Sequence, residues 1–207
     1  MYSYFRIFPF LFAVFFANGC ILLTNGDFSG IRDRFSESEF FPYKRLSLRI
    51  LYIPEKNDII FNLSEEEQQE REQEWKKILS SAYRNSGLFE EVVLDEPGDI
   101  EMRIKIVEVE AEDRNFSYLI SKGYGFAPYR EEGSFLMSSD FYNSEGVHLG
   151  SVDLSEKYEY YYQVLFVFLM PFYYPSGEYE KLVENMGLKT LQQALSKGYL
   201  KIGSSKK

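Results

Sequence analysis

Few side chains in this 207-residue sequence can support nucleophilic, metal or acid–base chemistry. There is one cysteine, Cys20, and one histidine, His148. Zinc sites built from His and Cys are therefore not available, and neither is a Cys–His nucleophilic pair. His148 lies in or just after a predicted hairpin turn, where a solvated position is the default, and a catalytic histidine needs placed partners. We expect no catalytic residue, no metal site and no cofactor, and hence no enzyme.

Carboxylates are the abundant acid–base groups that remain. The two largest clusters, residues 65–67 and the alternating set Glu108, Glu110 and Glu112, are interpreted as a helix start and a solvent-facing strand edge. Catalysis by carboxylates needs two of them facing each other in a cleft, and sequence spacing does not reveal such a pair. An enzyme with paired carboxylates therefore stays an alternative, which a buried, facing pair would support.

Three tyrosines recur at every second position: Tyr158, Tyr160 and Tyr162. In a strand this spacing puts the three phenols on one face. They could pack across strands in the core or under a helix. They could instead form a platform on which a sugar or a partner protein stacks. The second interpretation gives the alternative function, a carbohydrate- or surface-ligand-binding module.

Cys20 follows a segment that is typical of an exported leader. Arg6 precedes ten apolar residues, 7–16, and the small residues Ala17-Asn18-Gly19 come just before Cys20. This pattern predicts a signal peptide over residues 1–19, too short for the roughly 20 residues of a membrane span. The motif resembles the lipobox of bacterial lipoproteins: Gly19 fits, while Ala17 stands where leucine is usual. The resemblance implies cleavage before Cys20 and its modification with diacylglycerol and palmitate.

Two other interpretations of this segment stay open. Ordinary cleavage would leave Cys20 as a free thiol, although an unpaired cysteine is unusual in an exported protein. A retained anchor is also possible, because Ile21-Leu22-Leu23 extend the apolar run to about 17 residues. The lipoprotein interpretation predicts attachment to the membrane through Cys20 in a bacterial cell envelope, with the outer membrane favoured over the inner.

Composition limits the possible partners. The chain has 23 basic and 32 acidic residues, a net charge of −9, and loss of Arg6 with the leader makes it −10. Such an acidic protein has no long-range attraction to nucleic acid or to an anionic membrane surface. A single cysteine also excludes a disulfide within the chain. We therefore expect a protein partner in the envelope, no nucleic acid, and a domain held together by packing.

Periodicity predicts the first elements of that domain. Residues 46–53 alternate as a strand and stop at Pro54. A helix begins at Ser64, whose spacing to Glu67 is that of a capping box. Residues 88–94 and 99–112 are two further strands, and a change of apolar parity predicts a β-bulge near Ile106-Val107. The inward face of the helix, which ends at Gly87, comprises Trp75, Ile78, Leu79, Ala82 and Tyr83.

The second half of the chain predicts a hairpin and a last helix. Strands over 134–142 and 147–162 are joined by the loop 143–146. The last helix starts near Ser176 and contains Gly187, which could divide it in two. Residues 160–175 carry no charge; they are interpreted as a buried central strand, with a membrane-dipping loop or a spanning helix as alternatives. The inward stripe of the last helix comprises Tyr179, Leu182, Val183, Met186, Thr190, Leu191 and Ala194.

These elements predict an α+β fold: a mostly antiparallel sheet of about five or six strands with two helices packed on one face. We expect a lipidated, flexible tether over 20–45, one domain over 46–202, and a disordered tail over 203–207. The element order resembles the small domains of bacterial envelope lipoproteins that assist transport or assembly. The resemblance implies a membrane-anchored protein with a non-enzymatic binding or assembly role toward another envelope component.

Overall fold

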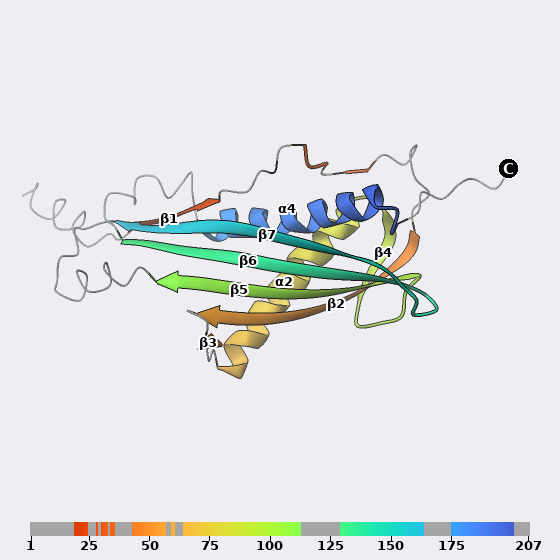
Figure 1. Ribbon diagram of the computed structural model, residues 1–207, viewed down its shortest axis with the longest axis horizontal. Helices are drawn as coiled ribbons and strands as arrows, with labels where there is room; N and C mark the ends of the chain where they lie inside the picture. Colours follow the sequence, from red (N-terminus) through yellow and green to blue (C-terminus); the bar gives the residue numbers. More distant parts are fainter. Residues whose placement is uncertain are drawn as a thin grey trace, which may run out of the picture.

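A computed structural model shows how these elements are arranged (Figure 1). It describes residues 19–24, 28, 30–32, 34–35, 43–56, 59–60, 64–112, 129–163 and 175–200. The strands are β1 (Gly19–Thr24), β2 (Tyr43–Lys56), β3 (Ile59–Ile60), β4 (Phe89–Leu94), β5 (Ile100–Glu112), β6 (Tyr129–Asn143) and β7 (His148–Gln163). The helices are α2 (Glu65–Asn85) and α4 (Pro175–Ser196).

The strands form one sheet in the order β1-β7-β6-β5-β2-β3, with β4 paired to β2 off this path. The fold class is α+β, as predicted, but the sheet is mixed rather than mostly antiparallel. β2 runs parallel to both β4 and β5, while the other neighbours are antiparallel. The reason is α2, which returns the chain to the end of the sheet where β2 began, so that the next strand runs in the same direction.

The turn between β4 and β5 crosses over β2. β4 pairs with one edge of β2 and β5 with the other, and the register puts Leu94 beside Leu48 and Ile100 beside Leu46. Gly98 lies in this crossing, where a Cβ would be 2.7 Å from the backbone nitrogen of Ser47. No larger residue fits at that approach without a shift of the backbone. The chain therefore passes from one edge of β2 to the other at Ser47, with β4 before this crossing and β5 after it.

α2 begins and ends as its sequence predicts. Ser64 is the N-cap, and the capping box with Glu67 is formed in both directions. Gly87 follows the helix with a φ of +78°, the left-handed conformation that glycine adopts without strain. The inward face is also confirmed, with Ile78 partly buried at its margin. Its buried members are Trp75, Leu79, Ala82 and Tyr83.

α4 is one continuous helix, and the whole predicted inward stripe is buried. Gly187 does not divide it. A Cβ at Gly187 would lie 2.7 Å from Cδ2 of Leu79 and 3.1 Å from Cε1 of Tyr83, both on α2. Glycine here therefore permits the two helices to approach each other closely.

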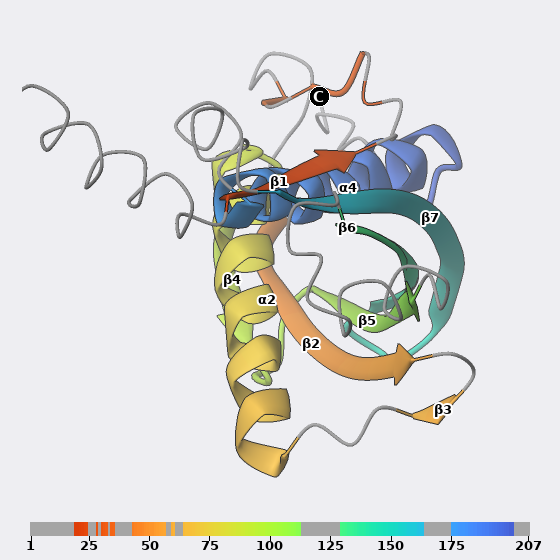
Figure 2. The same cartoon turned by 90° about the vertical axis from the view of Figure 1, so that its left-hand side faces the viewer.

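The sheet is strongly curled, and both helices lie on its concave side (Figure 2). The core fills the space between them. Apolar side chains from β2, β5, β6 and β7 meet the buried faces of α2 and α4 there. This arrangement confirms the prediction that both helices pack on one face of the sheet.

The predicted β-bulge in β5 is wrong. The pairing of β5 with β2 and with β6 is continuous through Ile106 and Val107. Alternate residues stay buried from Ile100 to Ile106, and the next inward position is Glu108, which is 7% exposed. The apolar residues switch from even to odd positions because the inward position after Ile106 is a glutamate, while the apolar Val107 and Val109 face outward. A register irregularity does occur between β6 and β7, near Phe141.

Several predictions fall partly or wholly outside the described residues. Only 160–163 of the apolar stretch 160–175 is described, as the end of β7, so its three interpretations stay open. The tail 203–207 and the leader up to residue 18 also lie outside. Within the described residues, no helix is both long and apolar enough to cross a membrane.

Candidate functional site

Cys20, the expected lipidation residue, is the second residue of β1. β1 pairs antiparallel with the end of β7, and the register sets Cys20 opposite Tyr162. This differs from the expected tether over 20–45. Leu22 is 1% exposed, whereas Leu23 faces outward at 38%, so β1 alternates as a half-buried strand. In the sequence, Ile21-Leu22-Leu23 fell within the expected tether or, in the retained-anchor alternative, extended the apolar leader, and a strand this short was not recognised.

Residues after β1 also contact the domain. Phe35 is 3% exposed, and its backbone N–H donates to the carbonyl of Ser86 at 2.8 Å. Lys189 on α4 lies 5.5 Å from the ring centroid of Phe28. β2 then begins at Tyr43, three residues before the predicted strand. The described residues between Cys20 and Tyr43 therefore include core positions as well as connecting ones.

A buried carboxylate, Glu108 on β5, is the centre of a polar cluster inside the curled sheet. Its Oε1 accepts a hydrogen bond of 2.9 Å from the hydroxyl of Tyr158, and its Oε2 accepts one from Tyr52. Tyr52 comes from β2 and Tyr158 from β7, on opposite sides of β5. Gly133 on β6 makes room, because a Cβ there would lie 2.1 Å from Cζ of Tyr158. Two phenol donors stabilise the ionised form of the carboxylate.

Aromatic rings surround this cluster. The ring centroid of Phe135 lies 4.9 Å from that of Tyr158, 5.2 Å from that of Trp75 and 5.4 Å from that of Tyr179. These contacts join β6, β7, α2 and α4 in one apolar group. The indole nitrogen of Trp75 and the hydroxyl of Tyr179 are buried and form no hydrogen bond within the described part of the chain.

Arg71 lies at the outer side of the cluster. Its Cζ is 5.6 Å from the ring centroid of Tyr179, and its Nη1 is 3.4 Å from Oε2 of Glu74. Burial, and then the negative charge of Glu108, raise the pKa of Tyr179 well above its ordinary value. Burial lowers the pKa of Arg71, but electrostatic interactions with the Tyr179 phenol and with the carboxylate of Glu108 outweigh it and raise the pKa overall. The cluster therefore keeps Arg71 charged beside a buried carboxylate.

This geometry bears on the predicted tyrosine platform. Tyr158 is 1% exposed, and its hydroxyl donates a hydrogen bond to Glu108. For this residue the structure therefore matches the alternative of packing in the core. The side chains of Tyr160 and Tyr162 lie outside the described ones. A stacking platform therefore gains no exposed ring from Tyr158 and stays a hypothesis for the other two. Glu108 was interpreted as solvent-facing, but it is buried. The sequence signal that would have placed it inside is the alternation of inward and outward residues, which continues without a break from Ile100.

A second carboxylate, Glu156 on β7, also lies in the interior at 7% exposure. Its Oε1 is 2.7 Å from Nζ of Lys189 on α4. The register puts Phe135 of β6 between Glu156 and Glu108. An aromatic residue thus separates the two buried carboxylates, and each has partners of its own.

His148 is exposed at the start of β7, as expected. Its Nε2 lies 3.1 Å from Oγ of Ser151 and 3.4 Å from Oδ1 of Asp140. In a catalytic triad the serine faces one ring nitrogen and the carboxylate the other. Here both contacts involve the same nitrogen, and the hydroxyl of Ser151 donates a hydrogen bond to Oδ1 of Asp140. Among the described residues no group of three or more His, Cys, Asp or Glu side chains could hold a metal ion.

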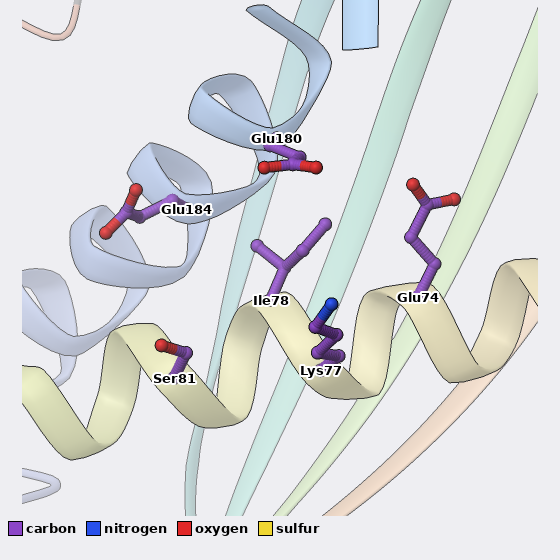
Figure 3. Close-up of a pocket in the computed structure, with 6 residues that line it drawn as sticks. All are labelled: Glu74, Lys77, Ile78, Ser81, Glu180 and Glu184. Atoms are coloured by element: carbon purple, nitrogen blue, oxygen red, sulfur yellow. The ribbon is translucent and has the colours of Figure 1, made fainter. Parts of the chain in front are cut away.

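An acidic groove runs between the outer sides of the two helices. It has a volume of about 240 Å³, and Figure 3 shows carboxylates from both helices around it, with Ile78 between them. Lys77 is the basic residue in its lining. The lining residues are Glu74, Lys77, Ile78, Ser81, Glu180 and Glu184.

The convex face of the sheet carries an outward-facing apolar row, formed by the half-buried Ile53 and Val107 and the exposed Leu136 on three neighbouring strands. Leu136 is 44% exposed, and the adjacent Leu51 is 52% exposed. A shallow hollow of about 310 Å³ lies beside this row, over β5, β6 and β7. Of this row, Val107 belongs to the set Val107, Val109 and Ala111, whose change of parity was interpreted as a bulge.

Comparison with known proteins gives no family. No family model and no curated protein matches the chain. A minor lipoprotein from Acinetobacter baumannii is similar in structure with a TM-score of 0.33 and 8% identity, over 76% of this chain and 90% of the other. A PelC dodecamer from Paraburkholderia phytofirmans has a TM-score of 0.29 and 7% identity, over 86% of this chain and 95% of the other. Scores this low carry no argument about function.

Proposed function

We propose that this chain is a bacterial lipoprotein that is cleaved before Cys20 and acylated there, and that holds a binding domain at an envelope membrane. The observation that carries this proposal is the place of Cys20. It follows a basic residue, an apolar run and small residues, and it is the second residue of an edge strand of the folded domain. The acyl chains would therefore start at the sheet itself.

Direct attachment has a physical consequence. A flexible coil of about 25 residues would allow a separation of roughly 27 Å from the membrane. With Cys20 already paired opposite Tyr162, the end of the sheet where β7 finishes would instead lie close to the bilayer. One acyl chain alone binds only marginally, so firm attachment requires several. The net charge makes other attraction to an anionic membrane unfavourable.

A binding role is the second part of the proposal. Glu108 and Glu156, the buried carboxylates, are engaged by tyrosines and by Lys189. The chain offers a groove between its helices and an apolar row on its sheet, which are surfaces that a protein can contact. We infer a non-enzymatic role in which the domain binds another envelope protein.

Labelling with radioactive palmitate in bacterial cells tests the lipid. The wild type and a Leu23→Ser control should take up label, while Cys20→Ser should not. Mass spectrometry of the purified wild type should show Cys20 as an acylated first residue. An unlabelled wild type with an unmodified N-terminus would overturn the lipoprotein proposal.

Purification from the native envelope in mild detergent tests the binding role. We expect one envelope protein to be recovered with the wild type at a fixed molar ratio after chemical cross-linking. Recovery of the chain without any other protein, at its native expression level, would contradict this role.

A further inference from the structure

The apolar row on the convex face adjoins a region whose charges are already paired. Nearer the other end of this face, Glu101 accepts from Arg103 at 2.8 Å and lies 3.2 Å from Arg49. Arg103 in turn stacks over the ring of Tyr142 at 4.4 Å. Water solvates such paired charges well, whereas burying exposed leucines against another protein is favourable because it removes apolar surface from water. The apolar end is therefore the part of this face suited to contact with another protein.

We propose that a second copy of this chain covers that end, related by a two-fold axis that runs parallel to β6 in the plane between the two sheets. This operation places β6 against β6, and β5 of each copy against β7 of the other. Leu136 would then face Leu136 across the axis, and Val107 would face Ser155. The sheets would pack face to face at the usual separation of about 10 Å.

The charges on this face are complementary under the same operation. Lys105, Ser138 and Asp153 lie in one row across β5, β6 and β7. Lys105 makes no ion pair with a described residue, and Asp153 accepts a hydrogen bond of 2.6 Å from Ser138. Rotation about β6 sets Lys105 of each copy opposite Asp153 of the other. Two ion pairs would therefore flank the leucine contact, although the whole chain is acidic.

The positions of the anchors favour this axis over a perpendicular one. Rotation about an axis along the strands preserves strand direction, so both Cys20 residues lie at the same end of the dimer. A two-fold axis across the strands would put them at opposite ends, where one membrane could not hold both. This argument rests on the proposed function, whereas the apolar row and the charge pairs do not.

The contact area predicts a weak dimer. Because the face is convex, contact is confined to β5, β6 and β7, which covers Val107 and Leu136 and leaves Ile53 and Leu51 on β2 outside the interface. Over about eight residues their footprint is roughly 400 Å² per copy, from strand spacing and rise. A standard stable interface has about 800 Å² per partner. We therefore expect reversible association in solution, strengthened for two copies held on one membrane by their high effective concentration.

Cross-linking of the full chain on a Cys20→Ser background tests the interface without any lipid. Ser138→Cys lies on the proposed axis, and Ser81→Cys on α2 is the matched control. A bismaleimide with a span of about 10 Å should link Ser138→Cys chains into dimers, with far less product from Ser81→Cys. Equal yields from the two sites would overturn the proposal, whatever palmitate labelling of the wild type shows.

Charge reversal tests the pairing. Lys105→Asp or Asp153→Lys alone should weaken dimerisation about tenfold in analytical ultracentrifugation, and the double reversal should restore it. Leu136→Arg should abolish it, whereas Leu94→Arg on β4, similarly exposed, should not. A double reversal as weak as the single variants, or equal effects of the two arginine variants, would refute the interface.

Discussion

The hydroxyl of Tyr158 donates a 2.9 Å hydrogen bond to Oε1 of Glu108, although the two residues lie on β7 and β5 with β6 between them. The curl of the sheet and the missing side chain at Gly133 permit this contact. Glu108 is thereby bonded from two strands at once. This contact should stabilise the polar end of the core.

We expect Tyr158→Phe to lower the free energy of unfolding by about 2 kcal/mol, because it removes a donor from a buried charge. Urea denaturation measures this loss. Tyr142→Phe is the control, since Tyr142 stacks under Arg103 and is only half-buried. A loss for Tyr158→Phe no larger than that of the control would show that the bond contributes nothing to stability.

β1 should be an integral strand of the fold. Leu22→Ala should cost about 3 kcal/mol of unfolding free energy, because Leu22 is 1% exposed. Leu23→Ala should stay within about 0.5 kcal/mol, because Leu23 faces outward. Thermal denaturation of the two variants distinguishes the alternatives: equal, small effects would restore the flexible tether expected for residues 20–45.

The ion pair of Glu156 and Lys189 joins β7 to α4. Lys189→Met should cost about 2 to 3 kcal/mol, because it leaves the buried Glu156 without its cation. Adding Glu156→Leu should recover most of this loss, since an apolar pair then fills the same space. A double variant less stable than Lys189→Met alone, by denaturant unfolding, would contradict this account.

The capping box should make stability depend on pH. The Ser64 hydroxyl and then its backbone N–H hydrogen-bond to Glu67 and lower the pKa of Glu67 below 4.5. A depressed pKa in the folded state gives stability that is present above about pH 4.5 and is lost as the pH falls through the folded value. The advantage of the wild type over Glu67→Gln should therefore shrink between about pH 7 and pH 3.

Glu66→Gln is the control for this prediction. It removes a charge from the same first turn but leaves the bonds between Ser64 and Glu67 in place. Its stability difference from the wild type should change little over the same pH range. Parallel pH profiles for the two variants would show that the cap does not cause the effect.

Features governed by neighbouring residues were predictable. The capping box at Ser64, the glycine stop at Gly87, the buried faces of both helices and the hairpin loop between β6 and β7 follow from spacings of a few residues. Such patterns depend on helix and turn geometry that the local chain determines. The lipobox resemblance at Cys20 is of the same local kind, so it could be recognised without a fold.

Features governed by distant residues were not predictable. The sequence contains an outward Val107 and an inward Glu108, but only the partners Tyr52 and Tyr158 explain why a carboxylate tolerates the interior. The parallel pairing of β2, the crossing at Gly98 and the incorporation of β1 likewise depend on which strands meet. Strand pairing and burial are long-range contacts, whereas sequence patterns report only the local period. The tertiary structure therefore decided where the polar core, the edge strand and the outward-facing apolar row lie.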